Sequence, residues 1–269
     1  MQKEQQKGVM FYNNMFAHDH YEVHRYDVGS YCTRQEIIKS IQHTSGTVLE
    51  IGTGISTLLE DLPTFERFGI DLSPESIKRV QDIFSRKNIK ATLSVADATK
   101  LPFPDNFFDV IVSSHVLEHI EHDAYVIQEC ARVLRPGGEL ILWVPGRISG
   151  VATREEWENN GHYRMYNKKR FYDLESQVAP VLKITSLCYT HKIHNLVWNR
   201  AKHAVRWMNY PLKKYIFRDN KTYEIRPTYQ KIFLPAIVTA LNACDRMTRK
   251  TEKNFLGAEF NVLVRFEKK

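Results

Sequence analysis

A regular alternation of strand-like and helix-like segments constrains the fold of this chain more than any other feature. Short apolar or β-branched runs, which favour strands, alternate with longer amphipathic stretches through the first 190 residues. Because parallel strands need helical crossovers, this order predicts an α/β fold with a doubly wound, mostly parallel sheet and helices on both faces. The expected strands are 47–52, 65–72, 91–97, 109–114, 139–146, 182–193 and 259–267.

The helical segments carry recognisable start and stop signals. Ser73-Pro74-Glu75 is a strong helix start, with proline at the first helical position, and the helix it opens places Ile77, Val80 and Phe84 on one face. A second helix is expected from Asp123 until Pro136 and Gly137-Gly138 end it, and a third at 168–180. In the last strand, one side is expected to hold Phe260, Val262, Val264 and Phe266.

The pattern divides the chain into four expected segments. Residues 1–45 form an N-terminal lid or helix, 46–193 form the main domain, and 258–269 return as its final, antiparallel strand. Residues 194–257 are too many for a hairpin turn, so they are expected to form a helical insert rich in basic and aromatic residues. Two helices are expected in it, over 195–210 and 234–250.

The charge is spread unevenly along the chain. Residues 1–150 hold 15 Lys+Arg against 20 Asp+Glu, whereas residues 151–269 hold 23 against 11. A basic second half indicates an anionic partner, such as a phosphate, a nucleic acid or a membrane surface, with a solvated basic face as the alternative.

The composition predicts a cytoplasmic protein without a membrane span or a metal. No run approaches the roughly 20 apolar residues of a membrane helix, and the N-terminus lacks the apolar stretch of a secretory signal. The four cysteines are scattered without a C-x-x-C pair, which is typical of reduced thiols: Cys32, Cys130, Cys188 and Cys244. His18, His20 and His24 have a metal-like spacing, but no further ligand set supports a metal there.

A glycine-rich turn follows the first strand in the stretch Glu50-Ile51-Gly52-Thr53-Gly54. A dinucleotide fingerprint would need a third glycine at position 57, which is Thr57, and no phosphate-loop Gly-Lys-Ser/Thr ending is present. Glycines allow close backbone approach to a ligand, and the acid before them can orient the turn or contact the ligand.

This turn resembles the opening motif of the class I methyltransferases that use S-adenosylmethionine (SAM), written E/D-x-G-x-G-x-G, with Ser56 at the third glycine. Four further blocks resemble the family in order: 95–103 (its G-D-A-x-x-L-P-F block), 107–111, 115–119 (V-L-E-H) and 132–138 (R-x-L-K/R-P-G-G). The resemblance covers about 47–146 and is strongest to the group that includes the ubiquinone and menaquinone methyltransferases. It implies a Rossmann-like seven-stranded sheet, SAM as cofactor and a small-molecule acceptor.

The resemblance also implies which residues contact the cofactor. Asp71 ends the second strand, where a carboxylate can accept both ribose hydroxyls, and Asp97 takes the family's position beside the adenine amine. The complete expected cofactor set is Glu50, Gly52, Thr53, Gly54, Asp71, Leu72, Asp97, Ala98, Ser114, His115 and His119.

Methyl transfer from a sulfonium is chiefly a matter of positioning, and a histidine base can add to it when the acceptor is a hydroxyl. His115 and His162 are the candidates for catalysis; His119, four residues after His115, is expected in the cofactor pocket. The segment from Gly161 resembles the group's G-H-x-R-x-(F/Y), so acceptor contacts are expected at Tyr163, Arg164 and Tyr166.

Two other functions remain open from the sequence. An RNA methyltransferase would use the basic, aromatic second half, although the D/N-P-P-Y/F motif and a Pro-Cys pair are missing. A non-catalytic SAM-binding partner protein is the third possibility. The insert also suggests peripheral membrane contact through its amphipathic helices, and the sequence does not indicate an oligomeric state.

Overall fold

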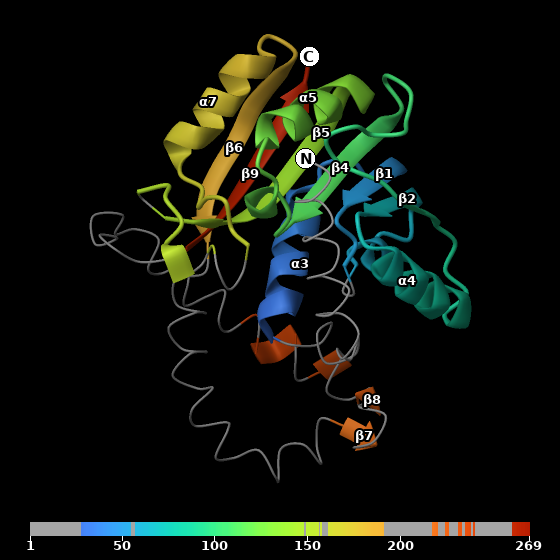
Figure 1. Ribbon diagram of the computed structural model, residues 1–269. Helices are drawn as coiled ribbons and strands as arrows, with labels where there is room; N and C mark the ends of the chain where they lie inside the picture. The colour runs from blue at the N-terminus through green and yellow to red at the C-terminus, as the bar shows by residue number, and fades with distance from the viewer. Residues whose placement is uncertain are drawn as a thin grey trace.

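The computed structural model (Figure 1) describes residues 28–54, 57–147, 149–155, 157, 161–190, 217–219, 224–225, 231–232, 235–237, 239 and 260–269. The expectations for the segment before Val28, for Ser56, for Cys244 and for the helix over 195–210 lie outside these residues.

A seven-stranded mixed sheet forms the centre of the fold, with strand order β3-β2-β1-β4-β5-β9-β6. All neighbouring pairs from β3 to β5 are parallel, and β9 is antiparallel to both of its neighbours. This confirms the predicted α/β class, the mostly parallel sheet and the antiparallel final strand. The strands are β1 Gly46–Ile51, β2 Phe65–Asp71, β3 Thr92–Val95, β4 Phe108–Ser114, β5 Leu134–Gly146, β6 Leu182–Thr190 and β9 Phe260–Lys268.

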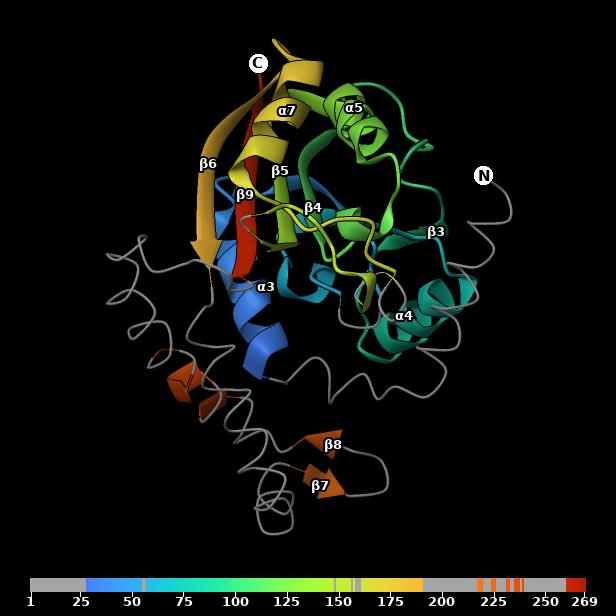
Figure 2. The same cartoon turned by 60° about the vertical axis from the view of Figure 1, so that its left-hand side comes forward.

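Helices cover both faces of the sheet, as Figures 1 and 2 show. On one face lie α3 (Val28–Ser40) and α4 (Pro74–Arg86), and on the other α5 (Asp123–Val133) and α7 (Lys168–Val178). Two short 3₁₀ turns, η1 (Leu59–Asp61) and η2 (Leu117–His119), follow the ends of β1 and β4.

The strands send alternate side chains into two separate cores, because successive residues of a strand face opposite sides. Ile111 of β4 joins the core beneath α5 and α7, whereas its neighbours Val110 and Val112 join the core beneath α3 and α4. Three of the four expected inward residues of β9, Val262, Val264 and Phe266, are fully buried in the first core. Burial on both faces explains why these strands are nearly continuous apolar runs.

Local signals explain where the helices begin and end. The Ser73 hydroxyl caps α4 by accepting a hydrogen bond from the Ser76 N–H, and Pro74 is the first helical residue, as expected. The expectation for the second helix was wrong at its end: α5 stops at Val133, because β5 already begins at Leu134 and includes the Arg135–Gly138 turn.

The insert between β6 and β9 contains elements that the pattern did not predict. Two short strands, β7 (Phe217–Asp219) and β8 (Glu224–Ile225), pair antiparallel in a second sheet. Residues 235–237 and 239 are helical, within the second helix expected there. Among the described residues, no helix is long and apolar enough to cross a membrane.

Candidate functional site

The carboxyl ends of the parallel strands bring the predicted motifs to one edge of the sheet. The glycine turn leaves β1 there, with Gly52 at φ +76° and Gly54 at φ +50°, in the left-handed region that favours glycine. A Cβ on Gly52 would collide with the Val116 side chain, so the turn needs glycine for space as well as for conformation. Beside it, the Thr53 hydroxyl is buried without a hydrogen-bond partner among the described residues.

Glu50 orients this turn. Its side chain is 3% exposed, and its carboxylate accepts hydrogen bonds from the Thr57 hydroxyl and from the N–H groups of Leu58 and Leu59. Of the two roles that the sequence left open, this geometry favours orientation of the turn over contact with a ligand.

Asp71 links the glycine turn to the start of α4. Its two carboxylate oxygens accept from the N–H of Gly54 at 2.9 Å and the N–H of Ser73 at 2.9 Å. Burial raises the pKa of Asp71, and the hydrogen bonds from Ser73, Gly54 and Ser76 only partly offset that effect. The carboxylate is thus held rigidly at the end of β2.

Asp97 and its neighbours form the next part of this edge. Asp97 accepts from the N–H of Thr99 at 2.8 Å and from the Thr99 hydroxyl at 2.7 Å, which fixes the turn after β3. Ala98 is buried, and Leu72 is half-buried. The acids at the ends of β2 and β3 and the glycine turn after β1 form a polar cradle whose donor set fits the carboxylate, ammonium, ribose and adenine groups of SAM.

The segment after β4 is a 3₁₀ turn and not an α-helix. Ser114 is half-buried at the strand end, and His115 has φ +55°, which turns the chain sharply into η2. His115 and His119 therefore do not share a helix face, but both contact the side chain between them. The His115 Nδ1 atom lies 3.2 Å from Glu118 Oε1, and the His119 Nε2 atom lies 3.9 Å from the same oxygen.

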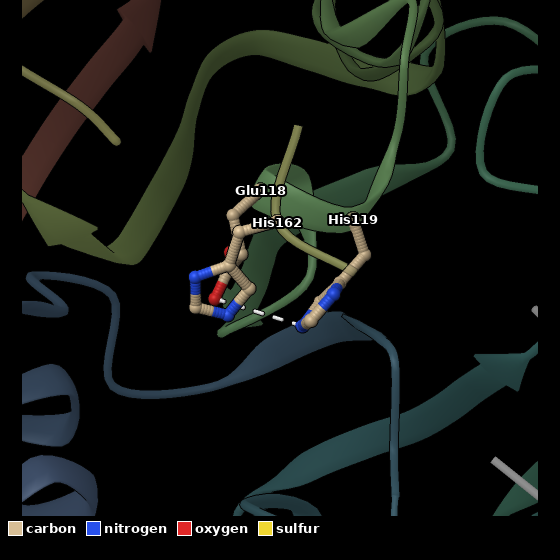
Figure 3. A group of neighbouring side chains, drawn as sticks. All are labelled: Glu118, His119 and His162. Atoms are coloured by element: carbon tan, nitrogen blue, oxygen red, sulfur yellow. Dashed lines mark ion pairs between the residues drawn. The ribbon is translucent and has the colours of Figure 1, made fainter. Parts of the chain in front are cut away.

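Glu118, His119 and His162 form a compact cluster (Figure 3), in which one ligand-type atom from each side chain lies within 4.8 Å of the other two. Burial acts to raise the pKa of Glu118, but the hydrogen bond from His115 and the charges of His115 and His119 outweigh it, so this pKa is lowered. Burial lowers the pKa of His119 against the opposing charge of Glu118. The rings of His119 and His162 meet edge to face with centroids 4.9 Å apart.

The loop that carries His162 is tied to η2 and to α5. The Tyr163 N–H donates to the Glu118 carbonyl at 2.8 Å, which sets His162 beside Glu118. Trp157 is 47% exposed and packs edge to face on Tyr163, with ring centroids 4.5 Å apart. Tyr163 therefore lies next to an exposed aromatic side chain.

Arg164 and Tyr166 have a different role from the expected acceptor contact. Arg164 donates to the carbonyls of Ile120 and Glu121, and its Nη1 lies 3.4 Å from the Asp123 carboxylate. Tyr166 is fully buried, and its hydroxyl donates to Asp123 at 2.9 Å. Both side chains are thus corrected to structural anchors of the loop, bound to a carboxylate that is itself fully buried.

Sequence reasoning missed three residues at this site. Asp123 was expected only as a helix start, yet it binds Arg164, Tyr166 and Arg170. Glu118 was part of a family motif without a role of its own, and Trp157 was not considered. The histidine next to Glu118 in the sequence was a usable signal for a role of Glu118. No local pattern marks long-range partners such as those of Asp123.

Comparison with known proteins gives matches over the same region. Residues 49–142 match the family described as a methyltransferase domain. The chloroplastic tocopherol O-methyltransferase of Arabidopsis thaliana is 36% identical over 121 residues, which are 42% of this chain and 35% of that protein. The ubiquinone/menaquinone biosynthesis C-methyltransferase of Burkholderia mallei is 31% identical over 102 residues, which are 36% of this chain and 42% of that protein.

A solved structure extends the likeness of fold. Phosphoethanolamine N-methyltransferase 2 of Haemonchus contortus, in complex with S-adenosyl-L-methionine, superimposes with a TM-score of 0.60 over 90% of this chain and 53% of that one, at 16% identity. That likeness concerns the fold alone. The chain spans less than half the length of the two curated relatives. The matched motifs and relatives confirm the predicted resemblance: residues 49–142 match a methyltransferase domain and are similar to class I SAM-dependent methyltransferases such as the ubiquinone and menaquinone enzymes.

Proposed function

We propose that the protein transfers a methyl group from SAM to a small-molecule acceptor by in-line displacement. The observation that carries this proposal is the cradle at the carboxyl edge of the sheet, where Gly52, Asp71 and Asp97 meet beside the half-exposed His115. When bound, SAM supplies a methyl group on a sulfonium centre that is a good leaving group. The protein's main contribution is then to align the acceptor with this methyl group, and alignment of this kind is worth about 7–11 kcal/mol.

The cofactor side of the site is proposed to act through fixed donors and acceptors. The backbone of Gly52, Thr53 and Gly54 allows close approach, and Asp71 accepts the ribose hydroxyls with the oxygen lone pairs that the backbone does not use. Asp97, Ala98 and Leu72 surround the adenine, while Ser114 and His119 lie under the methionine part. Glu50 acts indirectly by holding the turn.

The acceptor is proposed to sit beside the loop around His162. The exposed Trp157 packs there on the half-buried Tyr163, and this aromatic pair suits a hydrophobic acceptor. The two named relatives act on tocopherol and in ubiquinone or menaquinone biosynthesis, and a hydrophobic ring-bearing acceptor follows by analogy. The insert over 194–257 is proposed as a cap on this side.

A proton must leave the acceptor if it is a hydroxyl, and His115 is the better placed of the two candidates. The buried Glu118 carboxylate orients its Nδ1 atom, so that Nε2 on the exposed side of the ring can receive a proton. His162 is less open, and its Nδ1 is buried. The exposed His115 side chain is therefore the proposed group nearest the acceptor.

The cytoplasm is the proposed compartment. The three cysteines that the structure describes, Cys32, Cys130 and Cys188, are in no disulfide, which suits a reducing environment.

Isotope-labelled SAM tests the proposal directly. The purified protein is incubated with a cell extract and methyl-labelled SAM, and the label is followed by mass spectrometry in the small-molecule, RNA and protein fractions. Label in small hydrophobic molecules, reduced with an Asp71→Ala variant at a limiting SAM concentration, is the expected result. Label confined to RNA would favour the nucleic-acid alternative and contradict the small-molecule acceptor, and SAM binding without any labelled product would indicate a non-catalytic protein.

A further inference from the structure

We propose that Glu118, His119 and His162 bind a divalent transition-metal ion of the Zn²⁺ class. The three side chains come from η2 and from the loop after β5, which the fold brings together at the carboxyl edge of the sheet (Figure 3). Binding of the ion requires neither SAM nor an acceptor, so it can be measured separately from the proposed methyl transfer, with which it shares His119 and Glu118.

The carboxylate of Glu118 is the strongest indication of a missing cation. Its side chain is 0% exposed, and its Oε2 atom has no hydrogen-bond partner among the residues that the structure describes. Within the same residues, its ionic contacts are His115 and His119, without a lysine or arginine. A fully buried carboxylate oxygen without a donor is costly and rare, so a bound ligand is the expected explanation.

The donor set matches the coordination chemistry of such an ion. Two imidazole nitrogens and one carboxylate oxygen are the ligands of many catalytic zinc sites, and they leave at least one position open for water or a ligand. Oxygen-only ions such as Mg²⁺ are disfavoured, because two of the three donors are nitrogen.

The separations between the donors are somewhat wider than in a metal-loaded site. Ligand atoms about 2.1 Å from a tetrahedral ion lie about 3.4 Å apart, whereas His119 Nε2 lies 3.9 Å from the Oε1 atom of Glu118 and the ligand-type atoms of the three side chains all lie within 4.8 Å of one another. Closing the site requires movement of about 1 Å. Both histidine rings are only partly buried, so they can move toward the fixed carboxylate.

The surroundings hold the ligands in place. The N–H of Tyr163 binds the carbonyl of Glu118, which keeps His162 next to its partners, and His115 binds the Oε1 atom of Glu118 from the exposed side. Groups that hydrogen-bond to a metal-binding residue in this way orient it and commonly affect metal affinity. Glu118 Oε2 is left for the ion.

Metal binding is tested with the untagged full-length protein. It is stripped with EDTA and titrated with Zn²⁺ against a chromophoric chelator, and Co²⁺ absorption reports the coordination environment. One ion per chain is expected in the wild type. Loss of one ligand in Glu118→Gln or His162→Asn should weaken Zn²⁺ binding by about 100-fold or more. That is at or above the largest effects seen when a group that only hydrogen-bonds to a metal ligand is removed.

Two controls separate this site from other histidines. His122→Asn changes an exposed histidine of the same segment, and a variant with His18, His20 and His24 all replaced by Asn removes the other histidine-rich stretch of the sequence. Both should bind Zn²⁺ like the wild type. The proposal is overturned if the wild type binds no ion, if Glu118→Gln and His162→Asn both bind as well as the wild type, or if the triple variant abolishes binding.

Folding and SAM binding are measured on every variant. If Glu118→Gln fails to fold, the His162→Asn variant decides the result, because that residue lies in a partly exposed loop. Zn²⁺ binding without SAM binding would contradict the proposed function alone, and SAM binding without Zn²⁺ binding would contradict the metal site alone.

Discussion

The cofactor side and the acceptor side of the site differ in how completely their polar groups are bonded. Around the glycine turn, Glu50 and Asp71 each accept backbone N–H groups and hold their loops before any ligand binds. The buried Thr53 hydroxyl is left there without a hydrogen-bond partner among the described residues, and the polar groups are otherwise held by the backbone. Across the edge, Glu118 Oε2 and His162 Nδ1 are buried without hydrogen-bond partners among the described residues. The difference indicates that the cofactor site is largely preformed. On the acceptor side, the buried polar groups obtain their missing partners from whatever binds there.

The largest expected effect comes from the buried carboxylate that anchors the acceptor loop. Asp123→Ala leaves Arg164 and Arg170 without their partner and removes the acceptor of the Tyr166 hydroxyl. Because breaking a buried pair strands the remaining charge, we expect the free energy of unfolding to fall by about 3 kcal/mol, measured by urea denaturation. Asp173→Ala is the control.

Asp173 forms an exposed ion pair with Lys169, so its removal should change stability by less than about 0.5 kcal/mol. If the two variants were equally stable, Asp123 would not be the anchor of this loop. If Asp123→Ala weakened SAM binding as much as methyl transfer, the proposed separation between the two sides would be wrong.

A smaller effect is expected at the glycine turn. Gly52→Ala combines a left-handed backbone with a collision against Val116, whereas Gly137→Ala has the same kind of backbone, at φ +78°, in open space. We expect about 1 kcal/mol of destabilisation for Gly137→Ala and 1–3 kcal/mol for Gly52→Ala.

Only the Gly52 substitution should also weaken SAM binding, as calorimetric titration of both variants would show. Equal effects on SAM affinity would mean that the turn does not form the cofactor site.

The pH dependence of SAM binding is expected to be the smallest effect near neutral pH. Burial raises the pKa of Asp71 above its usual value of 3.8, and the ionised form is the one that accepts ribose hydroxyls. As pH falls through this raised pKa the carboxylate gains a proton, so affinity should drop by about tenfold per pH unit below it.

The drop should begin at a higher pH than the titration of an exposed aspartate, and Asp71→Asn should remove it. Isothermal titrations between neutral pH and pH about 4 measure both. A wild-type affinity that stayed constant to pH about 4 would show that Asp71 does not contact the cofactor.

Sequence patterns predicted where the proposed cofactor residues lie in the fold better than they predicted the contacts of the loop around His162, for a physical reason. The glycine turn, Asp71 and Asp97 lie at the ends of consecutive strands, so the order of elements alone brings them together. The acceptor side depends on contacts between distant segments, such as Asp123 with Tyr166, which no periodicity records.

The errors in the prediction follow the same division. The helix from Asp123 was predicted too long. Its last predicted residues also fit a strand, and from Leu134 onward they belong to β5. Arg164 was expected at the acceptor because its segment resembles the group's G-H-x-R-x-(F/Y), and only the fold shows that its donors bind the carbonyls of Ile120 and Glu121. The burial of Glu118 could not be predicted either.

Calorimetric titration of the wild type and of Asp71→Ala with SAM tests the central claim most directly. The account predicts one SAM bound per chain by the wild type. It predicts that Asp71→Ala, which loses a charge-assisted hydrogen bond, binds about 1.5–3 kcal/mol more weakly, while Asp105→Ala, at an exposed aspartate paired with Arg132, binds like the wild type. A wild-type protein that binds no SAM, or an Asp71→Ala variant that binds it as tightly as Asp105→Ala does, would contradict the account.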